Sequence, residues 1–232
     1  MLNSLPDGYR ACILGASGAI GQAFVGLLEA DPRCGMVIAL HRHSIPPINF
    51  ADESSIADAA EVLAAQPPFH LIIYAAGLLH TPDFMPEKKL GDLNYAQLQQ
   101  TFLVNTFGPA LVLRHFSRLL DRQRGVLALL SAKVGSIGDN RAGGWYSYRA
   151  SKAALNMLLK TAAIEIRRSQ PNSVLVALHP GTVQSRLSQP FRAGDKARPP
   201  AVAALEMLQT LDTLQAADSG SFVAYNGERL PW

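Results

Sequence analysis

Short apolar runs alternate along the chain with longer stretches in which apolar residues recur every three or four positions. The short runs predict buried strands, because β-branched and aromatic residues fill them and turn residues follow. We expect strands at 9–14, 36–40, 69–74, 125–130, 173–179 and 221–225, and 46–50 is a candidate for a further short one. The longer stretches predict helices from a turn at 15–21 to about residue 30, and at 54–65, 93–120 (interrupted by Gly108-Pro109), 148–168 and 201–214.

This alternation predicts βαβ units and therefore a parallel sheet. The strands are almost continuously apolar, as expected when helices cover both faces of the sheet. The chain has no linker, internal repeat or low-complexity run, and the proline- and glycine-containing stretch 190–200 is short enough to be a loop. We expect one doubly wound α/β domain of the Rossmann type over residues 1–232, with its ligand beyond the C-terminal ends of the strands.

Composition excludes several classes of protein. The 232 residues are 48% hydrophobic and 17% charged, which excludes a disordered chain. No apolar run approaches the length of a membrane span, and the first apolar stretch lacks the layout of a signal peptide. Cys12 and Cys34 cannot form a disulfide framework, and no histidine, cysteine or carboxylate cluster has the spacing of metal ligands. We expect a cytoplasmic protein without a bound metal.

A glycine-rich turn joins the first strand to the first helix. Its small residues would let the backbone approach a diphosphate, and the helix N-terminus would supply N–H donors and a partial positive charge. Tight packing of the turn alone is the other explanation. We interpret the turn as a dinucleotide site formed by Gly15, Ser17, Gly18, Ile20 and Gly21.

The end of the second strand bears on the choice of cofactor. A dinucleotide fold that prefers NAD usually has an acidic residue there, which binds the ribose hydroxyls. This chain has His41, Arg42 and His43 instead. Arg42 could hold a 2′-phosphate, so we expect NADP(H) as the cofactor. NAD(H) is the alternative if Arg42 is merely solvated.

Tyr148 and Lys152 are four residues apart at the start of a predicted helix, and therefore lie on one face. A tyrosine has an unperturbed pKa near 10, and a nearby ammonium group would lower it. Such a pair could pass a proton to or from a substrate oxygen. The spacing is common by chance, but here it accompanies the glycine turn.

Together these segments resemble the short-chain dehydrogenase/reductase family in its compact single-domain form. The glycine turn, the Tyr-Arg-Ala-Ser-Lys segment at 148–152 and Pro180-Gly181 occur in the family's order, and the resemblance covers nearly the whole chain. The segments at 131–137, 143–148 and 180–183 look most like the C-factor-like subgroup. That subgroup contains carbonyl reductases and a proposed intercellular signal protein.

The resemblance implies a role for each matching residue. Tyr148 would be the general acid/base, Lys152 would lower its pKa and bind the nicotinamide ribose, and Ser131 would hold the substrate oxygen. Asn105 would support a water-linked proton relay. The remaining cofactor contacts that the resemblance implies are Asn49 near the adenine, Ala75, Gly77 and Pro180, and Val183 and Ser185 at the carboxamide.

Three departures from the family's pattern stand out. Most members have their second glycine where this chain has Ala19, and the family's Asn-Asn-Ala-Gly is Tyr-Ala-Ala-Gly at 74–77. Ser131 precedes Tyr148 by more residues than usual, which predicts an enlarged loop at 138–145. Ser136 has the more usual spacing, but we favour Ser131 because it directly follows a strand.

The resulting hypothesis is an NADP(H)-dependent carbonyl reductase or alcohol dehydrogenase, assembled as a homodimer or homotetramer as the family commonly is. The alternative is a nucleotide-binding signalling or interaction protein on the same fold. A basic ridge at Arg114, Arg118 and Arg122 could suggest nucleic-acid binding, but a solvated helix face explains it better. Trp145, Leu187 and Phe191 are expected near the mouth of the site, as an apolar pocket or as plain packing.

Overall fold

Six parallel strands form one sheet in the computed structural model, which describes residues 2–191 and 197–232. The strands are β1 (Tyr9–Leu14), β2 (Cys34–Leu40), β3 (Leu71–Tyr74), β4 (Val126–Leu130), β5 (Val174–His179) and β6 (Ser221–Ala224). Their order across the sheet is β2-β1-β3-β4-β5-β6, and every neighbouring pair is parallel. The doubly wound fold expected from the sequence is confirmed.

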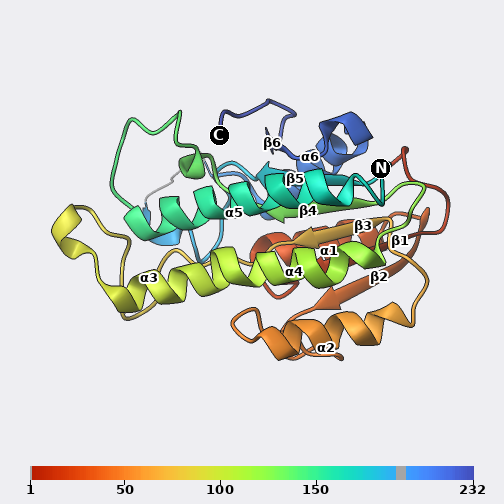
Figure 1. Cartoon of the computed structure of the whole chain (residues 1–232), viewed down its shortest axis with the longest axis horizontal. Helices are drawn as coiled ribbons and strands as arrows, with labels where there is room; N and C mark the ends of the chain where they lie inside the picture. The colour runs from red at the N-terminus through yellow and green to blue at the C-terminus, as the bar shows by residue number, and fades with distance from the viewer. Residues whose placement is uncertain (1, 192–196) are drawn as a thin grey trace.

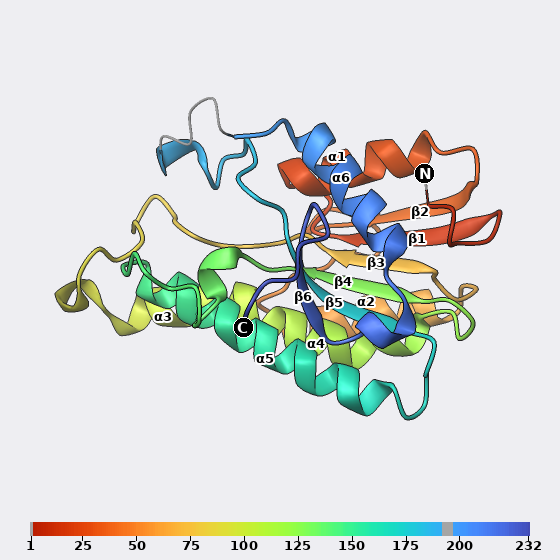
Figure 2. The same cartoon turned by 90° about the horizontal axis from the view of Figure 1, so that it is seen from above.

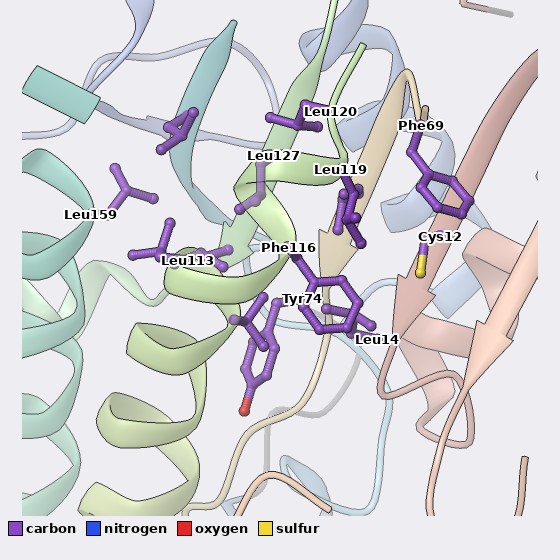
Figure 3. Packing of buried hydrophobic residues seen from close by; sticks show 14 of the residues in the cluster. Cys12, Leu14, Phe69, Tyr74, Leu113, Phe116, Leu119, Leu120, Leu127 and Leu159 are labelled. Atoms are coloured by element: carbon purple, nitrogen blue, oxygen red, sulfur yellow. The ribbon is translucent and has the colours of Figure 1, made fainter. Parts of the chain in front are cut away.

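Helices cover both faces of the sheet (Figure 2). On one face lie α1 (Ala19–Glu29) and α6 (Pro200–Thr213), and on the other lie α2 (Glu53–Ala64), α4 (Gly108–Phe116) and α5 (Tyr146–Ile166). The two apolar cores follow the alternation of strand side chains, since Ala11 and Ile13 face α1 and α6 while Cys12 and Leu14 face the other layer. Figure 3 shows the second core, in which Phe116 of α4 and Tyr74 of β3 are among the buried residues.

The long helical stretch expected at 93–120 is one nearly continuous rod (Figure 1). It begins with α3 (Tyr95–Phe102), widens to a π-helical turn at Leu103–Phe107, continues as α4 and ends in a 3-10 turn at Ser117–Leu119. Proline has no N–H, so Pro109 cannot donate to the carbonyl four residues earlier. The helix therefore widens before Gly108-Pro109 and is not broken there.

The candidate strand at 46–50 is wrong, because this segment is irregular. Pro46 and Pro47 lack the N–H groups that a strand ladder needs. The segment is held instead by Ile48, whose side chain is buried and whose N–H donates to the carbonyl of His41. Of the loop expected at 190–200, residues 192–196 lie outside the described residues.

No helix in the described part of the chain is both long and apolar enough to cross a membrane.

The chain leaves β1 for β2 on one side and returns to β3 on the other side of β1. This reversal makes the gap between the loops after β1 and β3 the topological switch point, where open α/β sheets bind ligands at the C-terminal strand ends. The candidate site should therefore be formed by the loops after β1, β3, β4 and β5.

Candidate active site

A cleft of about 720 Å³ opens at this edge of the sheet. It is lined by the glycine turn, the end of β2, the segment after β3, and residues from the loops after β4 and β5. Among the described residues that line it, none is acidic, whereas Arg42, Lys152 and Arg186 are basic. A cleft with only basic charged groups attracts an anionic ligand.

The glycines of the turn after β1 serve two purposes. Gly15 has a φ of +87°, and a Cβ there would lie 2.8 Å from the backbone nitrogen of Ala76; a Cβ on Gly21 would lie 2.3 Å from the carbonyl oxygen of Gly15. Both glycines are therefore required by the packing of the turn. A Cβ on Gly18 would have only an ordinary contact at 3.5 Å, and Gly18 is exposed to the cleft. Its small size leaves room for a ligand.

The N-terminus of α1 faces the same cleft. Its N-cap residue, Gly18, offers no side chain to cap the helix, and the first turn carries no acidic residue. The first N–H groups of a helix are thus left for an anion. Ser17 and Ile20 also line the cleft, whereas Gly21 is buried behind the turn and does not.

The groups expected around the adenine and ribose line the cleft. Arg42 follows β2, is exposed and lines the cleft together with His41 and Asn49. Ala75 and Gly77, which follow β3, line it as well. The cleft thus brings the glycine turn and Arg42 together, although they are more than twenty residues apart in sequence.

Tyr148 and Lys152 lie in the first two turns of α5 and face the cleft. The Lys152 Nζ lies 5.9 Å from the centroid of the Tyr148 ring and donates a hydrogen bond of 2.9 Å to the carbonyl oxygen of Leu130. The lysine side chain is thereby tied to the last residue of β4. Both residues are buried, and Lys152 is only 2% exposed.

The expected lowering of the Tyr148 pKa is wrong. Burial raises the pKa of Tyr148 to about 12 and lowers the pKa of Lys152 to about 7. Both shifts have the same cause, because a low-dielectric site disfavours whichever form of a group is charged. The lysine faces the ring of Tyr148 and is held by a carbonyl, so its attraction for the phenolate does not outweigh burial.

The structure separates the two candidate serines. Ser131 follows β4, is held there by its N–H, which donates to the carbonyl of Leu178 at 2.9 Å, and lines the cleft. Its hydroxyl donates a hydrogen bond of 2.6 Å to Asn156 Oδ1. The hydroxyl of Ser136 instead donates to the carbonyl of Trp232 at 3.2 Å, and Ser136 does not line the cleft. Only Ser131 shares the cleft with Tyr148 and Lys152.

Asn105 lies in the π-helical turn and does not line the cleft. Its side chain is fully engaged: Nδ2 donates to the carbonyl of Leu78 at 2.7 Å and to Ser151 Oγ at 3.1 Å, and Oδ1 accepts from the N–H of Leu78 at 2.8 Å. The Ser151 hydroxyl in turn donates to the carbonyl of Tyr148. The side chain of Asn105 thus fastens the segment after β3 to the helix that carries Tyr148 and Lys152.

The segment after β5 supplies the last expected contacts. Pro180 and Ser185 line the cleft, but Val183 is buried and does not. Arg198 anchors this segment. Its guanidinium donates hydrogen bonds to the carbonyl of Pro180 and to the carboxylate of Glu206, and it lies over the ring of Tyr225.

An apolar cluster lies beside Tyr148. Trp145 lies 4.8 Å from Phe191 and 6.1 Å from Tyr148 between ring centroids, and Leu187 packs in the same cluster. Of the three residues expected near the mouth of the site, Leu187 lines the cleft, whereas Trp145 and Phe191 pack beside Tyr148 without lining it.

Two functional-site residues were not found from the sequence. The buried Glu87 carboxylate accepts from the N–H and the hydroxyl of Ser147, and so holds the start of α5 from a distant loop. No local signal could reveal that contact, because the two residues are sixty positions apart. Asn156 was also missed, although its place four residues after Lys152 puts it on the same face of α5.

Comparison with known proteins identifies relatives. A family model described as short chain dehydrogenase matches residues 42–196. The chain is 38% identical over 147 residues to C-signal of Myxococcus xanthus, a match that covers 62% of this chain and 83% of that protein. It is 32% identical over 155 residues to 1-hydroxy-2-glutathionyl-2-methyl-3-butene dehydrogenase of a Rhodococcus strain, which covers 67% of each chain.

Solved structures share the fold. NADPH-bound carbonyl reductase from chicken fatty liver superposes with a TM-score of 0.85 at 24% identity, over 98% of this chain and 96% of the other. A short-chain dehydrogenase/reductase from Burkholderia multivorans with bound NADP gives a TM-score of 0.78 at 22% identity, over 97% and 99% of the two chains. The arrangement of sheet and helices is therefore shared along nearly the whole chain.

The two kinds of glycine in the turn predict different consequences of substitution. Gly18→Val should weaken NADPH binding at least tenfold, a loss of about 1.4 kcal/mol, with little change in Tm. Gly21→Ala should lower Tm strongly, because its Cβ would overlap the carbonyl of Gly15. Thermal unfolding and a titration followed by nicotinamide fluorescence measure both effects. Equal loss of Tm in the two variants would show that Gly18 is also required for packing.

The buried lysine predicts a pH-dependent stability. Lys152 has a pKa of about 7 in the folded protein and an ordinary value of 10.5 when exposed, so the unfolded chain binds more protons between these values. The free energy of unfolding should therefore rise with pH through this window, by at most about 1.4 kcal/mol per pH unit for one proton. Lys152→Met should lose this part of the rise.

Urea unfolding at pH 7, 8.5 and 10 measures the difference between wild type and variant. Lys160→Met, which removes an exposed lysine of the same helix, is the matched control and should keep the rise. A wild-type curve parallel to that of Lys152→Met would contradict the lowered pKa.

Proposed function

The chain belongs to the short-chain dehydrogenase/reductase family, and from that membership we propose that it is an oxidoreductase that transfers a hydride between NADP(H) and the carbonyl or alcohol carbon of a small molecule. The observation that carries the proposal is the single cleft shared by the glycine turn, Ser131, Tyr148 and Lys152. A pure binding module has no need of a buried proton donor beside a buried lysine.

The cleft fits a nicotinamide dinucleotide. The open N-terminus of α1 and the exposed Gly18 would receive the diphosphate. Asn49, Ala75, Gly77, Pro180 and Ser185 also line the cleft. From the resemblance to the family, Asn49 would lie near the adenine and Ser185 near the carboxamide. The side chain of Val183 is buried away from the cleft, so this residue would contact the cofactor through its backbone. When bound, the cofactor supplies or accepts the hydride.

The residues of this chain manage the proton. In the direction of reduction, the Tyr148 hydroxyl would give its proton to the oxygen of the forming alkoxide, and Ser131 would stabilise that oxygen with a hydrogen bond. Burial raises the pKa of Tyr148 to about 12, so the phenol is protonated at neutral pH, as it would also be at its ordinary value of 10. In its ammonium form, Lys152 would stabilise the tyrosinate that remains and bind the ribose hydroxyls.

Two features support NADP(H) over NAD(H). Arg42 stands at the end of β2 beside the cleft, and none of the described residues lining the cleft is acidic. An arginine can bind a phosphate with two parallel hydrogen bonds, while a free ribose is usually bound by a carboxylate. NADPH in the fold neighbour from chicken and NADP in that from Burkholderia are in line with this preference.

The outer surface of α4 and α5 supports assembly with further copies of the chain. Met157 is 66% exposed and Ile164 56%, both on α5, and Phe107 at the start of α4 is 51% exposed. These two helices lie side by side in both views (Figures 1 and 2). A homodimer or homotetramer would cover this apolar surface.

A signalling role is the second candidate, because C-signal is among the relatives. In that role the fold would bind a nucleotide and present a surface, and turnover would be dispensable. The two candidates differ in whether they need the hydroxyl of Tyr148.

Replacing Tyr148 separates these functions. Tyr148→Phe should lower kcat for NADPH-dependent reduction of 4-nitrobenzaldehyde about 100-fold or more, because the proton donor is lost. Its affinity for NADPH should stay within about threefold of wild type, a difference of under about 1 kcal/mol. Tyr146→Phe, two residues earlier on α5, is the control and should remain active. Undiminished turnover in Tyr148→Phe would exclude the proposed acid.

Replacing Arg42 addresses the choice of cofactor. Arg42→Gln should weaken NADPH binding roughly ten- to hundredfold, because a charge-assisted hydrogen bond contributes about 1.5–3 kcal/mol, and should leave NADH binding nearly unchanged. Arg118→Gln removes the same charge from a salt bridge with Glu61 on an outer surface and should alter neither. Tighter binding of NADH than NADPH by the wild type would overturn the preference.

A further inference from the structure

Asn156 lies on the same face of α5 as the two residues proposed to move the proton. It is four positions beyond Lys152 and eight beyond Tyr148, which places the three side chains in successive turns. It is 3% exposed and does not line the cleft, so it would not touch a substrate there. Its side chain reaches instead across to the end of β4, where Ser131 lies.

The hydrogen bond between these residues occupies the one hydrogen of the serine. Ser131 Oγ donates to Asn156 Oδ1 at 2.6 Å. A serine hydroxyl has a single hydrogen to donate and two lone pairs to accept with. In this arrangement Ser131 can only accept from a ligand in the cleft, whereas a developing alkoxide needs a donor.

The other half of the same amide is unsatisfied. Asn156 Nδ2 is buried and has no hydrogen-bond partner among the described residues. A buried donor without an acceptor is unfavourable, because it has lost its hydrogen bond to water. Turning the amide by 180° about its last bond exchanges Oδ1 and Nδ2. The orphaned N–H would then donate to Ser131 Oγ, and the serine hydrogen would be free.

We propose that Asn156 is a positioning residue for Ser131, whose amide turns to release the serine hydroxyl as a donor toward the substrate oxygen. This inference rests on the proposed function of the cleft. No covalent bond changes in the step: one hydrogen bond from Ser131 to Asn156 is replaced by one from Asn156 to Ser131 and one from Ser131 to the substrate.

If Asn156 had only a structural role, its hydrogen bond with Ser131 would serve to join α5 to the end of β4. Lys152 already provides such a tie, through its 2.9 Å bond to the carbonyl of Leu130, the residue next to Ser131. Gly135 packs against the same helix, since a Cβ there would lie 2.7 Å from the Cβ of Lys152. The helix is thus held at this level without Asn156.

The first test is a double-mutant cycle in the full-length protein, with NADPH and 4-nitrobenzaldehyde as probes. Ser131→Ala should lower kcat about 100-fold, as loss of an oxyanion donor does. Asn156→Leu should lower kcat about tenfold with KM for NADPH unchanged, and the double variant should match Ser131→Ala alone. Asn172→Leu, the same change at an exposed asparagine, is the control. Independent, multiplying losses would overturn the inference.

Asn156→Asp distinguishes positioning from tying. The carboxylate keeps the shape and the acceptor for Ser131 but has no N–H to give, so it should lower kcat more than Asn156→Leu does. The difference between Asp and Leu should vanish when Ser131 is alanine. If Asn156 only joined helix to strand, Asp would be the milder change.

A measurement that needs no turnover tests the turning of the Asn156 amide separately from the proposed function. The side-chain NH₂ signal of Asn156 in ¹⁵N-labelled protein should show exchange on the μs–ms timescale, and Ser131→Ala should alter it. A sharp signal that Ser131→Ala leaves unchanged would overturn the turning amide. Failure of the wild type to reduce any carbonyl, with this exchange present, would count against the proposed function alone.

Discussion

The geometry of the cleft depends on one contact, in which the buried amine of Lys152 is held against the last carbonyl of β4. The hydrogen bond from Lys152 Nζ to the carbonyl oxygen of Leu130 fixes the position of α5 relative to the end of β4. Tyr148, one turn earlier on the helix, and Ser131, one residue later in the chain, are therefore kept in register. Together with the hydrogen bond from Ser131 to Asn156, this bond joins the first half of α5 to the end of β4.

The same contact is unfavourable for folding. Taking an amine out of water disfavours its charged form, which is why the pKa of Lys152 falls to about 7. Tyr148 is buried beside it, and its pKa rises to about 12 for the same reason. The site therefore holds two groups whose pKa values are shifted from their ordinary values, as catalytic sites commonly do. A ligand that brings charge into the cleft would change the protonation of both.

Supporting contacts converge on α5 from several distant parts of the chain. Asn105, in the π-helical turn forced by Pro109, bonds to Ser151, and the buried Glu87 holds Ser147 at the start of the helix. π-Helical turns occur frequently at functional sites, because they change the direction of a side chain without ending the helix. Here the turn aims an amide at the helix that carries Tyr148. The reactive residues are thus positioned by rigid elements, and the loops complete the cleft.

The cleft itself follows from the path of the chain and from small side chains. The reversal between β2 and β3 leaves a gap beside β1, and Gly15 lets the turn pass close to Ala76 at the end of β3. Basic residues then face this gap without acidic neighbours among the described lining residues. Shape and charge together favour an anionic, elongated ligand over a neutral one.

The sequence by itself determined what depends on neighbours along the chain. Short, almost continuously apolar runs between helical stretches specified the strands of a parallel sheet. The spacing of Tyr148 and Lys152 placed them on one helix face, and both signals depend only on residues close together in the sequence. Tertiary structure decided what depends on distant segments meeting: which serine enters the cleft, that Asn156 holds its hydroxyl, and that burial raises the pKa of Tyr148. It also left 46–50 outside the sheet, because no strand can pair through prolines without N–H groups. Burial and long-range hydrogen bonds arise only once the chain has packed, and a single sequence carries no local trace of them.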